Sequence, residues 1–150
     1  MQDLALIVVP VDLDQHTQKL VDFAIDMAKK LNCKIAFFHC VESVTSVPMG
    51  AMAMAQFKHE DYDSAHVKKA EEVLDGIIKK AAGKCDTCRG KVVVGDPVDK
   101  ILTYAEGQNA DMIIIGTHGK SGLTKILLGS VAHRVLKRAH CPVLVMNPYR

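Results

Sequence analysis

The chain has 150 residues, 49% of them hydrophobic and 24% charged, which is the composition of one globular domain spanning residues 1–150. A formal net charge of +2, with three Tyr, four Phe and no Trp, argues against a nucleic-acid-binding protein. No apolar run reaches the roughly 18 residues that cross a membrane, and the first residues lack the basic leader of a signal peptide. We therefore expect a cytoplasmic protein with no membrane partner.

Short runs rich in Val and Ile alternate with amphipathic segments of helical length. In chain order, the pattern predicts a strand at residues 4–11, a helix at 15–31, a strand at 34–41, a helix at 58–82, a strand at 87–94, a helix at 96–106, a strand at 111–116, a helix at 131–139 and a strand at 142–147. The segment 46–57, SVPMGAMAMAQF, is predicted as a long, mobile connection. Because apolar strands alternate with helices, we expect an α/β domain with an open five-stranded parallel sheet covered on both faces.

A glycine-rich stretch, GTHGKSGLTKILLGS, follows the fourth predicted strand at residues 116–130. It contains Gly-Lys-Ser, but the first glycine of a Walker loop would fall on Ile114, inside the strand, so the spacing excludes a P-loop. The first strand is followed by Asp12-Leu13-Asp14 and not by the glycines of a dinucleotide fingerprint. The glycines therefore need another explanation.

The glycines have the spacing G-x2-G-x9-G-S, formed by Gly116, Gly119, Gly129 and Ser130. Gly116 ends a buried strand, where a ligand can approach the backbone closely, and Gly119 can adopt a positive φ without steric cost. Gly129 and Ser130 stand at the start of a predicted helix, where free N–H groups bind anions. Two groups of amides that bracket one loop suit a polyphosphate.

This spacing resembles the ATP-binding branch of the universal stress protein family. The resemblance covers essentially the whole chain and includes VPVD at residues 9–12, VGDP at 94–97 and CPVLV at 141–145. It implies a Rossmann-like sheet of the adenine nucleotide alpha-hydrolase type, with the strand order 3-2-1-4-5. Strands one and four then flank the switch point, where open α/β sheets bind their ligands.

The resemblance also implies a ligand and the residues that bind it. Asp12 is expected at the ribose hydroxyls or the adenine edge, and the other expected binding residues are Pro10, Val11, Val41, Ile115, Gly116, Gly119, Gly129, Ser130 and Val131. The expected ligand is ATP, with AMP or ADP as alternatives and Mg²⁺ or Mn²⁺ as a cation that enters with the phosphates. Asp14 departs from the Ser or Gly of many members. It can cap the following helix, but it also adds a carboxylate near the phosphates.

These features predict a nucleotide-dependent stress-response or regulatory module with an unidentified protein partner. No catalytic base, arginine finger or carboxylate pair for Mg²⁺ is evident, so we expect little or no hydrolysis and assign no catalytic or metal-binding residue. A slow ATP- or adenylate-hydrolysing enzyme and a nucleotide-free interaction protein remain alternatives. The resemblance implies a homodimer through the last strand, and the apolar run Pro142–Met146 would leave an exposed edge if it were unpaired.

Two groups of side chains inside or near the glycine loop are weaker candidates. His118 has no identifiable nucleophile and orienting carboxylate around it, so we interpret it as a ligand-near or exposed residue and not as a catalyst. Lys120 and Lys125 are interpreted as solvated, because Leu123, Ile126, Leu127 and Leu128 indicate a short amphipathic turn.

The sulfur-containing residues are interpreted as structural. Cys85 and Cys88 have the spacing of a redox pair or half a zinc site, but no second pair follows and they precede a strand, so we expect neither function. The odd count of five cysteines favours a reducing compartment over a disulfide framework. Methionines 49, 52 and 54 indicate adaptable packing and not copper coordination.

Overall fold

The computed structural model describes residues 4–43, 49–117 and 128–148. In these ranges strands and helices alternate along the chain. They are β1 (Leu6–Pro10), α1 (Thr17–Leu31), β2 (Lys34–Glu42), α2 (Met49–Ala81), β3 (Cys88–Gly95), α3 (Pro97–Gly107), β4 (Met112–Gly116), α4 (Ser130–Arg138) and β5 (Val143–Met146).

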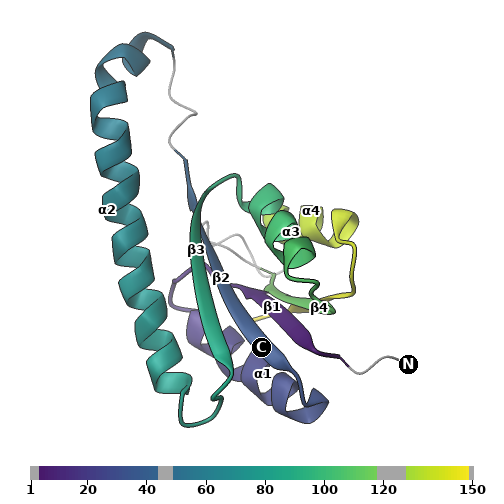
Figure 1. Cartoon of the computed structure of the whole chain (residues 1–150). Helices are drawn as coiled ribbons and strands as arrows, with labels where there is room; N and C mark the ends of the chain where they lie inside the picture. Colours follow the sequence, from purple (N-terminus) through teal and green to yellow (C-terminus); the bar gives the residue numbers. More distant parts are fainter. Residues whose placement is uncertain (1–3, 44–48, 118–127, 149–150) are drawn as a thin grey trace.

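The strands form one parallel sheet in the order β3-β2-β1-β4-β5 (Figure 1). Both the α/β class and the strand order expected from the sequence are confirmed. β1 lies at the centre, where it pairs with β2 on one side and with β4 on the other. The connections that follow β1 and β4 lead to opposite sides of the sheet. They therefore leave a crevice between them, at the carboxyl ends of these two strands.

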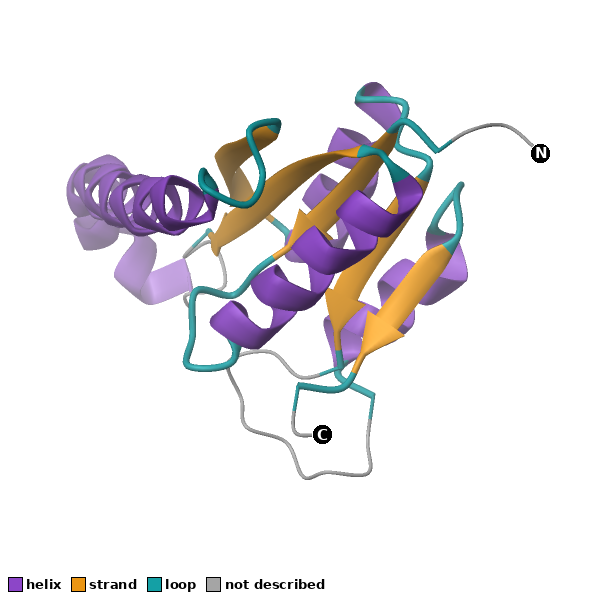
Figure 2. Ribbon diagram, turned by 90° about the horizontal axis from the view of Figure 1, so that it is seen from below, coloured by secondary structure: helices purple, strands orange, loops and turns teal. Residues whose placement is uncertain are grey.

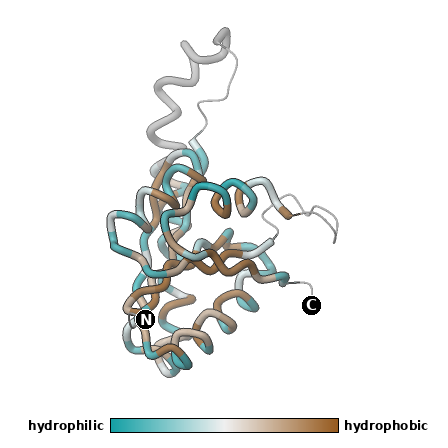
Figure 3. The backbone as a smooth tube through the Cα atoms, turned by 90° about the vertical axis from the view of Figure 1, so that its right-hand side faces the viewer, coloured by the Kyte–Doolittle hydropathy of each residue, from teal (hydrophilic) through white to brown (hydrophobic). Residues whose placement is uncertain are grey.

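Helices cover both faces of the sheet (Figure 2). The side chains of β1 alternate between the two faces. Ile7 and Val9 join the core beneath α1 and α2, whereas Leu6 and Val8 join the core beneath α3 and α4. The most hydrophobic segments run through the middle of the molecule along the strands (Figure 3). This double burial explains why the strands read as continuous apolar runs.

The expected start of α3 is confirmed in detail. Asp96 is the N-cap residue, and its carboxylate accepts a hydrogen bond of 3.0 Å from the backbone N–H of Asp99. Pro97 occupies the first turn, where its missing N–H has no partner to lose.

The predicted connection at residues 46–57 is partly wrong. From Met49 onward the chain is already helical, so that α2 is 33 residues long, while residues 46–48 lie outside the described part of the chain. Met, Ala and Gln are good helix formers, and the segment from 49 to 57 contains neither Pro nor a β-branched residue. None of the helices in the described ranges is long and apolar enough to span a membrane.

Candidate functional site

A pocket of about 360 Å³ opens at the carboxyl ends of β1, β2 and β4. It lies at the switch point of the sheet, and the first turn of α4 closes one side of it. Its volume falls within the range of roughly 300–1,000 Å³ that small-molecule sites occupy. Its walls combine apolar side chains such as Phe38 and Ile115 with polar ones such as Asp12 and Ser130.

The wall at the end of β1 is held firmly by β2. The backbone N–H of Val11 donates to the carbonyl of Phe38 at 2.8 Å, and the carbonyl of Val11 lies 2.6 Å from Nδ1 of His39. The side chain of the next residue, Asp12, is exposed in the pocket. Leu13 then turns the chain with a φ of 60°, a conformation that is uncommon for a residue with a side chain. The backbone therefore fixes where Asp12 enters the pocket.

Asp14 shapes the turn that leads into α1. Its carboxylate accepts hydrogen bonds from the backbone N–H of His16 at 2.9 Å and from the hydroxyl of Thr17 at 3.3 Å. The hydroxyl oxygen of Thr17 in turn accepts a bond of 2.9 Å from the backbone N–H of Asp14. The N-cap position belongs to His16, so the expectation that Asp14 caps α1 is wrong in detail. Asp14 instead stabilises the preceding turn, and it lines the pocket.

The opposite wall joins the end of β4 to the start of α4. The backbone N–H of Gly129 donates to the carbonyl of Thr117 at 2.6 Å, which brings Gly129 and Ser130 beside the end of the strand. The first backbone bond within α4 runs from the N–H of His133 to the carbonyl of Gly129. The N–H groups of Ser130, Val131 and Ala132 precede it and therefore have no acceptor within the helix. All three residues line the pocket.

The pocket contains most of the residues expected from the sequence. Eight of them line it: Pro10, Val11, Asp12, Ile115, Gly116, Gly129, Ser130 and Val131. Gly119, like His118, Lys120 and Lys125, lies outside the described residues.

Val41 is buried but does not line the pocket, whereas its neighbours Cys40 and Glu42 do. Alternate residues of a strand share a face, so Phe38, Cys40 and Glu42 are presented together and Val41 points to the other side. Sequence reasoning missed these three, although their period of two was available as a signal. It also missed Pro97 and Ile101, which line the pocket from α3 and come from a segment distant in sequence.

Cys40 is a neutral group in this wall. Burial, with smaller contributions from the carboxylates of Asp96 and Glu42, raises the pKa of its thiol to about 11. Its Sγ lies 3.4 Å from the carbonyl oxygen of Gly95, to which the thiol donates. The charged side chains of the described pocket lining are therefore carboxylates, contributed by Asp12, Asp14 and Glu42.

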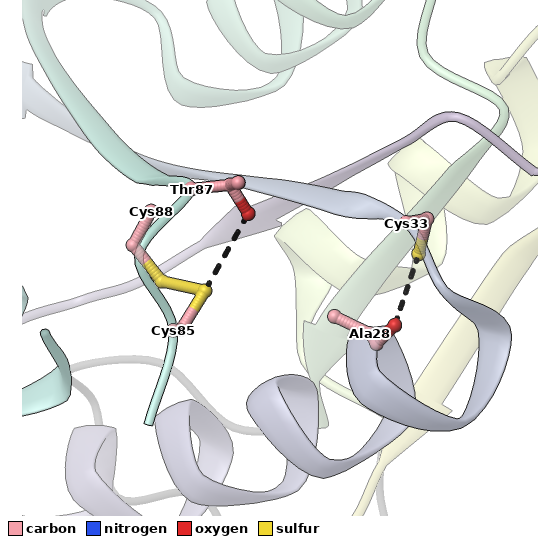
Figure 4. The surroundings of a disulfide bond; sticks show 5 residues. All are labelled: Ala28, Cys33, Cys85, Thr87 and Cys88. Atoms are coloured by element: carbon pink, nitrogen blue, oxygen red, sulfur yellow. Dashed lines mark hydrogen bonds between the residues drawn. A yellow bond between two sulfur atoms is a disulfide. The ribbon is translucent and has the colours of Figure 1, made fainter. Parts of the chain in front are cut away.

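Two of the five cysteines are joined, although the sequence favoured a reducing compartment over a disulfide framework. Cys85 and Cys88 form a disulfide (Figure 4), while Cys33, Cys40 and Cys141 are free thiols. The disulfide joins the turn after α2 to the first residue of β3. Because the sheet is parallel, the amino end of β3 lies away from the pocket, which is at the carboxyl ends of the strands. Among the described residues, no group of three or more His, Cys, Asp and Glu side chains is placed to hold a metal ion.

The sequence profile of the universal stress protein family matches residues 6–147 of the chain. The chain belongs to the universal stress protein family. It is 34% identical over 141 residues to universal stress protein MJ0531 of Methanocaldococcus jannaschii, an alignment that covers 94% of this chain and 81% of that protein.

Solved structures share the fold over nearly the whole chain. The structure of hypothetical protein MJ0577 has a TM-score of 0.79 at 24% identity, covering 97% of each chain. A universal stress protein in complex with cAMP has a TM-score of 0.67 at 23% identity, covering 98% of this chain and 99% of the other. The universal stress protein of Archaeoglobus fulgidus in complex with dAMP has a TM-score of 0.61 at 20% identity, with coverages of 96% and 98%.

Proposed function

We propose that this universal stress protein binds an adenine nucleotide, with ATP as the expected ligand, in the pocket at the carboxyl ends of β1 and β4. The observation that carries the proposal is the convergence of the motif residues. Asp12, Gly116, Gly129 and Ser130 are up to 118 positions apart in the sequence (130 minus 12), yet they line one pocket. Two structural neighbours with the same fold are complexes with adenine nucleotides, cAMP and dAMP.

The lining supplies the chemistry that each part of a nucleotide needs. The amides of Ser130 and Val131, at the positive end of the α4 dipole, suit phosphate oxygens. The carboxylate of Asp12 suits the ribose hydroxyls, and apolar side chains such as Val11 and Ile115 suit the faces of the base. A divalent cation, Mg²⁺ or Mn²⁺, would enter with the phosphates and reduce their repulsion from Asp12 and Asp14.

In this proposal the protein is a nucleotide-dependent stress-response or regulatory module that hydrolyses ATP slowly or not at all. The support is chemical: the described lining of the pocket carries no Lys or Arg to stabilise a transferring phosphoryl group. A slow hydrolase would release several equivalents of ADP or AMP per protein molecule. A nucleotide-free interaction protein would gain no thermal stability from ATP.

The deciding experiment is to denature the purified protein and to identify any released nucleotide by chromatography, followed by calorimetric titration of the emptied protein with ATP, ADP and AMP. Gly129→Val places a branched side chain beside the α4 amides, so we expect it to abolish binding without unfolding the chain. Gly107→Ala is the matched control, because a Cβ at Gly107 meets no atom within 4 Å. If the Gly129→Val variant binds ATP as tightly as the native chain, the phosphates do not lie at the α4 amides.

We further propose that the protein is a cytoplasmic homodimer that pairs through β5. β5 is an edge strand of the sheet, and its residues Val143–Met146 are only partly buried. Light scattering after size exclusion tests this: Val145→Lys is expected to yield monomers, whereas Val73→Lys, on the exposed face of α2, is expected to leave the dimer intact.

A further inference from the structure

We propose that Cys85 and Cys88 form a reversible dithiol–disulfide site that exchanges electrons with an external dithiol. The site lies at the amino ends of the strands, whereas the nucleotide pocket lies at their carboxyl ends. The proposal does not depend on nucleotide binding. It rests on the pairing of the two cysteines, on the hollow beside one of them and on the groups that line this hollow.

The short span of the disulfide is the first argument. The two cysteines are three positions apart, and their Cα atoms are 5.7 Å apart. In the chain-entropy account, the stability gained from a disulfide falls as the closed loop shortens, so this pair stabilises the fold less than a long-range pair would. The chain also keeps Cys33, Cys40 and Cys141 as free thiols. One short disulfide among free thiols is typical of redox chemistry and not of a structural framework.

Both cysteines are half-buried, but their surroundings differ. Cys85 lines a hollow of about 190 Å³ between the end of α1 and the turn after α2, whereas Cys88 is not part of that lining. Cys88 begins β3, where it is in register with Ile35. In this proposal an external thiolate attacks Cys85 from the hollow, and Cys88 is the sulfur that leaves.

Polar and charged groups surround Cys85. The hydroxyl of Thr87 lies 3.9 Å from Sγ of Cys85, within reach of a weak hydrogen bond to the reduced sulfur (Figure 4). Lys84 and Lys29 line the same hollow and place two positive charges around it, against the one negative charge of Asp86. Cys85 follows the C-terminal end of α2, where its backbone N–H donates to the carbonyl of Ala81 at 2.8 Å. The helix dipole disfavours negative charge at this end, and the two lysines oppose that effect.

Cys33 lines the same hollow but differs in its chemistry. Burial, with a smaller contribution from Asp111, raises the pKa of its thiol. Its Sγ is directed to the carbonyl of Ala28, 3.8 Å away (Figure 4). A protonated thiol that donates a hydrogen bond is a poor nucleophile. Cys33 is therefore an unreactive cysteine against which the reactivity of Cys85 and Cys88 can be compared.

The exchange balances in two steps. A thiolate of the external dithiol attacks Sγ of Cys85, the bond between the two protein sulfurs breaks, and Cys88 leaves as a thiolate that takes up a proton. The second thiol of the external dithiol then loses its proton and attacks the other external sulfur, which is bound to Cys85 in the mixed disulfide. Cys85 leaves as a thiolate and takes up that proton. The protein gains two electrons and two protons, and the external dithiol becomes a disulfide. The reverse sequence starts from the Cys85 thiolate.

The fold can pass through both states without unfolding. Two residues beyond Cys88, Gly90 lies so close to α2 that a Cβ there would come within 2.6 Å of Ile78 and 2.9 Å of Leu74. This packing holds the end of α2 against β3 independently of the disulfide. We therefore expect reduction to leave the circular dichroism spectrum unchanged.

The test is differential alkylation of the native full-length protein after equilibration in buffers of reduced and oxidised dithiothreitol, read by peptide mass spectrometry. We expect Cys85 and Cys88 to change state together and reversibly in the folded protein, while Cys33 stays alkylatable after denaturation in every buffer. Two results would overturn the proposal: a pair that stays fully reduced in the oxidising buffers, or a pair that is reduced only when the protein unfolds.

A second measurement assigns the attacked sulfur. With oxidised glutathione, Cys88→Ser is expected to accumulate one mixed disulfide on Cys85, and Cys85→Ser to react about tenfold more slowly at Cys88. Thr87→Val should slow the reaction of Cys88→Ser, and Cys33→Ser should leave the exchange of the pair unchanged. Equal rates for the two single-cysteine variants, or glutathione found on Cys33, would refute the assignment.

Discussion

Nδ1 of His39 lies 2.6 Å from the carbonyl oxygen of Val11, the residue that directly precedes the pocket carboxylate of Asp12. A carbonyl oxygen only accepts, so Nδ1 carries the proton of this bond. The N–H of Val11 is held as well, by the carbonyl of Phe38. His39 is only 5% exposed, and it therefore fixes the end of β1 from within the core.

His39→Phe is expected to destabilise the fold and to weaken nucleotide binding. The substitution removes a buried donor to the Val11 carbonyl, which costs about 1–3 kcal/mol, and it lets the turn at Asp12 relax. Chemical denaturation and calorimetry measure the two effects. His39→Asn offers an amide donor at a similar position, and we expect it to recover part of both losses. If His39→Phe binds ATP as tightly as the native chain, His39 does not position Asp12.

Asp12→Ala is expected to weaken the binding of ATP and AMP while it leaves the affinity for inorganic triphosphate unchanged or higher. In the proposed placement, Asp12 contacts the nucleoside and the α4 amides contact the phosphates. Removing the carboxylate therefore removes a contact to the nucleoside, while the phosphates lose no contact and are repelled less. Calorimetric titration with each of the three ligands separates the two contributions. Equal losses for ATP and for triphosphate would show that Asp12 is not on the nucleoside side.

Asp14→Asn is expected to bind ATP roughly threefold to tenfold more tightly, because it removes a negative charge from the pocket. Asn keeps the side-chain oxygen that accepts from the N–H of His16, so the turn before α1 should persist. The gain should shrink as salt is raised from about 0.01 to about 1 M, since screening weakens the repulsion in the native protein. Asp22→Asn, on the exposed face of α1, is the control, and a similar gain there would point to net charge alone.

Much of the sheet was predictable because it is buried on both faces. Its strands are continuous apolar runs, and helices separate them, so their number and their parallel sense follow from the sequence. The strand order came from the family resemblance. The sequence could have shown that Val41 does not line the pocket. Phe38, Cys40 and Glu42 alternate along the strand and therefore share one face, and Val41 belongs to the other face.

The disulfide and the contribution of α3 to the pocket, in contrast to the sheet, could not be predicted from local sequence patterns. A spacing of three between Cys85 and Cys88 is compatible with a turn, a metal half-site or a bond, and only the backbone of the turn after α2 brings the sulfurs together. Pro97 and Ile101 reach the pocket because α3 crosses the sheet beside β2, a relationship between segments that no local pattern encodes. The start of α2 has a local signal, because Met and Ala are good helix formers, and the unusual composition of residues 46–57 hid it.

Two glycines of the α2–β3 unit are expected to respond in opposite directions to substitution by Ala. A Cβ at Gly76, inside α2, meets no atom within 4 Å, so Gly76→Ala should raise the free energy of unfolding by about 0.5–1 kcal/mol. A Cβ at Gly90 would approach Ile78 to 2.6 Å, so Gly90→Ala should lower it by about 1–3 kcal/mol. Urea denaturation measures both. A stabilising Gly90→Ala would contradict the close packing of α2 on β3.

The thiol of Cys40 gives the stability of the protein a specific pH dependence. Its pKa is raised from the ordinary value of 9.0 to about 11, chiefly by burial. In the unfolded chain the thiol ionises as the pH passes 9, whereas in the folded chain it stays protonated until about 11. The unfolded state then binds fewer protons, so the stabilising contribution is complete below pH 9 and is lost progressively between pH 9 and 11.

Cys40→Ala should therefore be less sensitive to alkaline pH than the native chain, although it is less stable at pH 7 because it leaves a small cavity. The measurement is the melting temperature of both proteins from pH 7 to pH 11, kept in reducing buffer. Other groups that titrate at alkaline pH are present in both proteins, so the difference between their melting temperatures reports on the Cys40 thiol alone.

We expect this difference in melting temperature to be constant up to pH 9 and to become smaller above it. Cys141→Ala is the control, since burial also raises the pKa of Cys141, which does not line the pocket; its difference from the native chain should narrow over the same range of alkaline pH. A constant difference across the whole range would mean that Cys40 ionises equally well in the folded and unfolded chain.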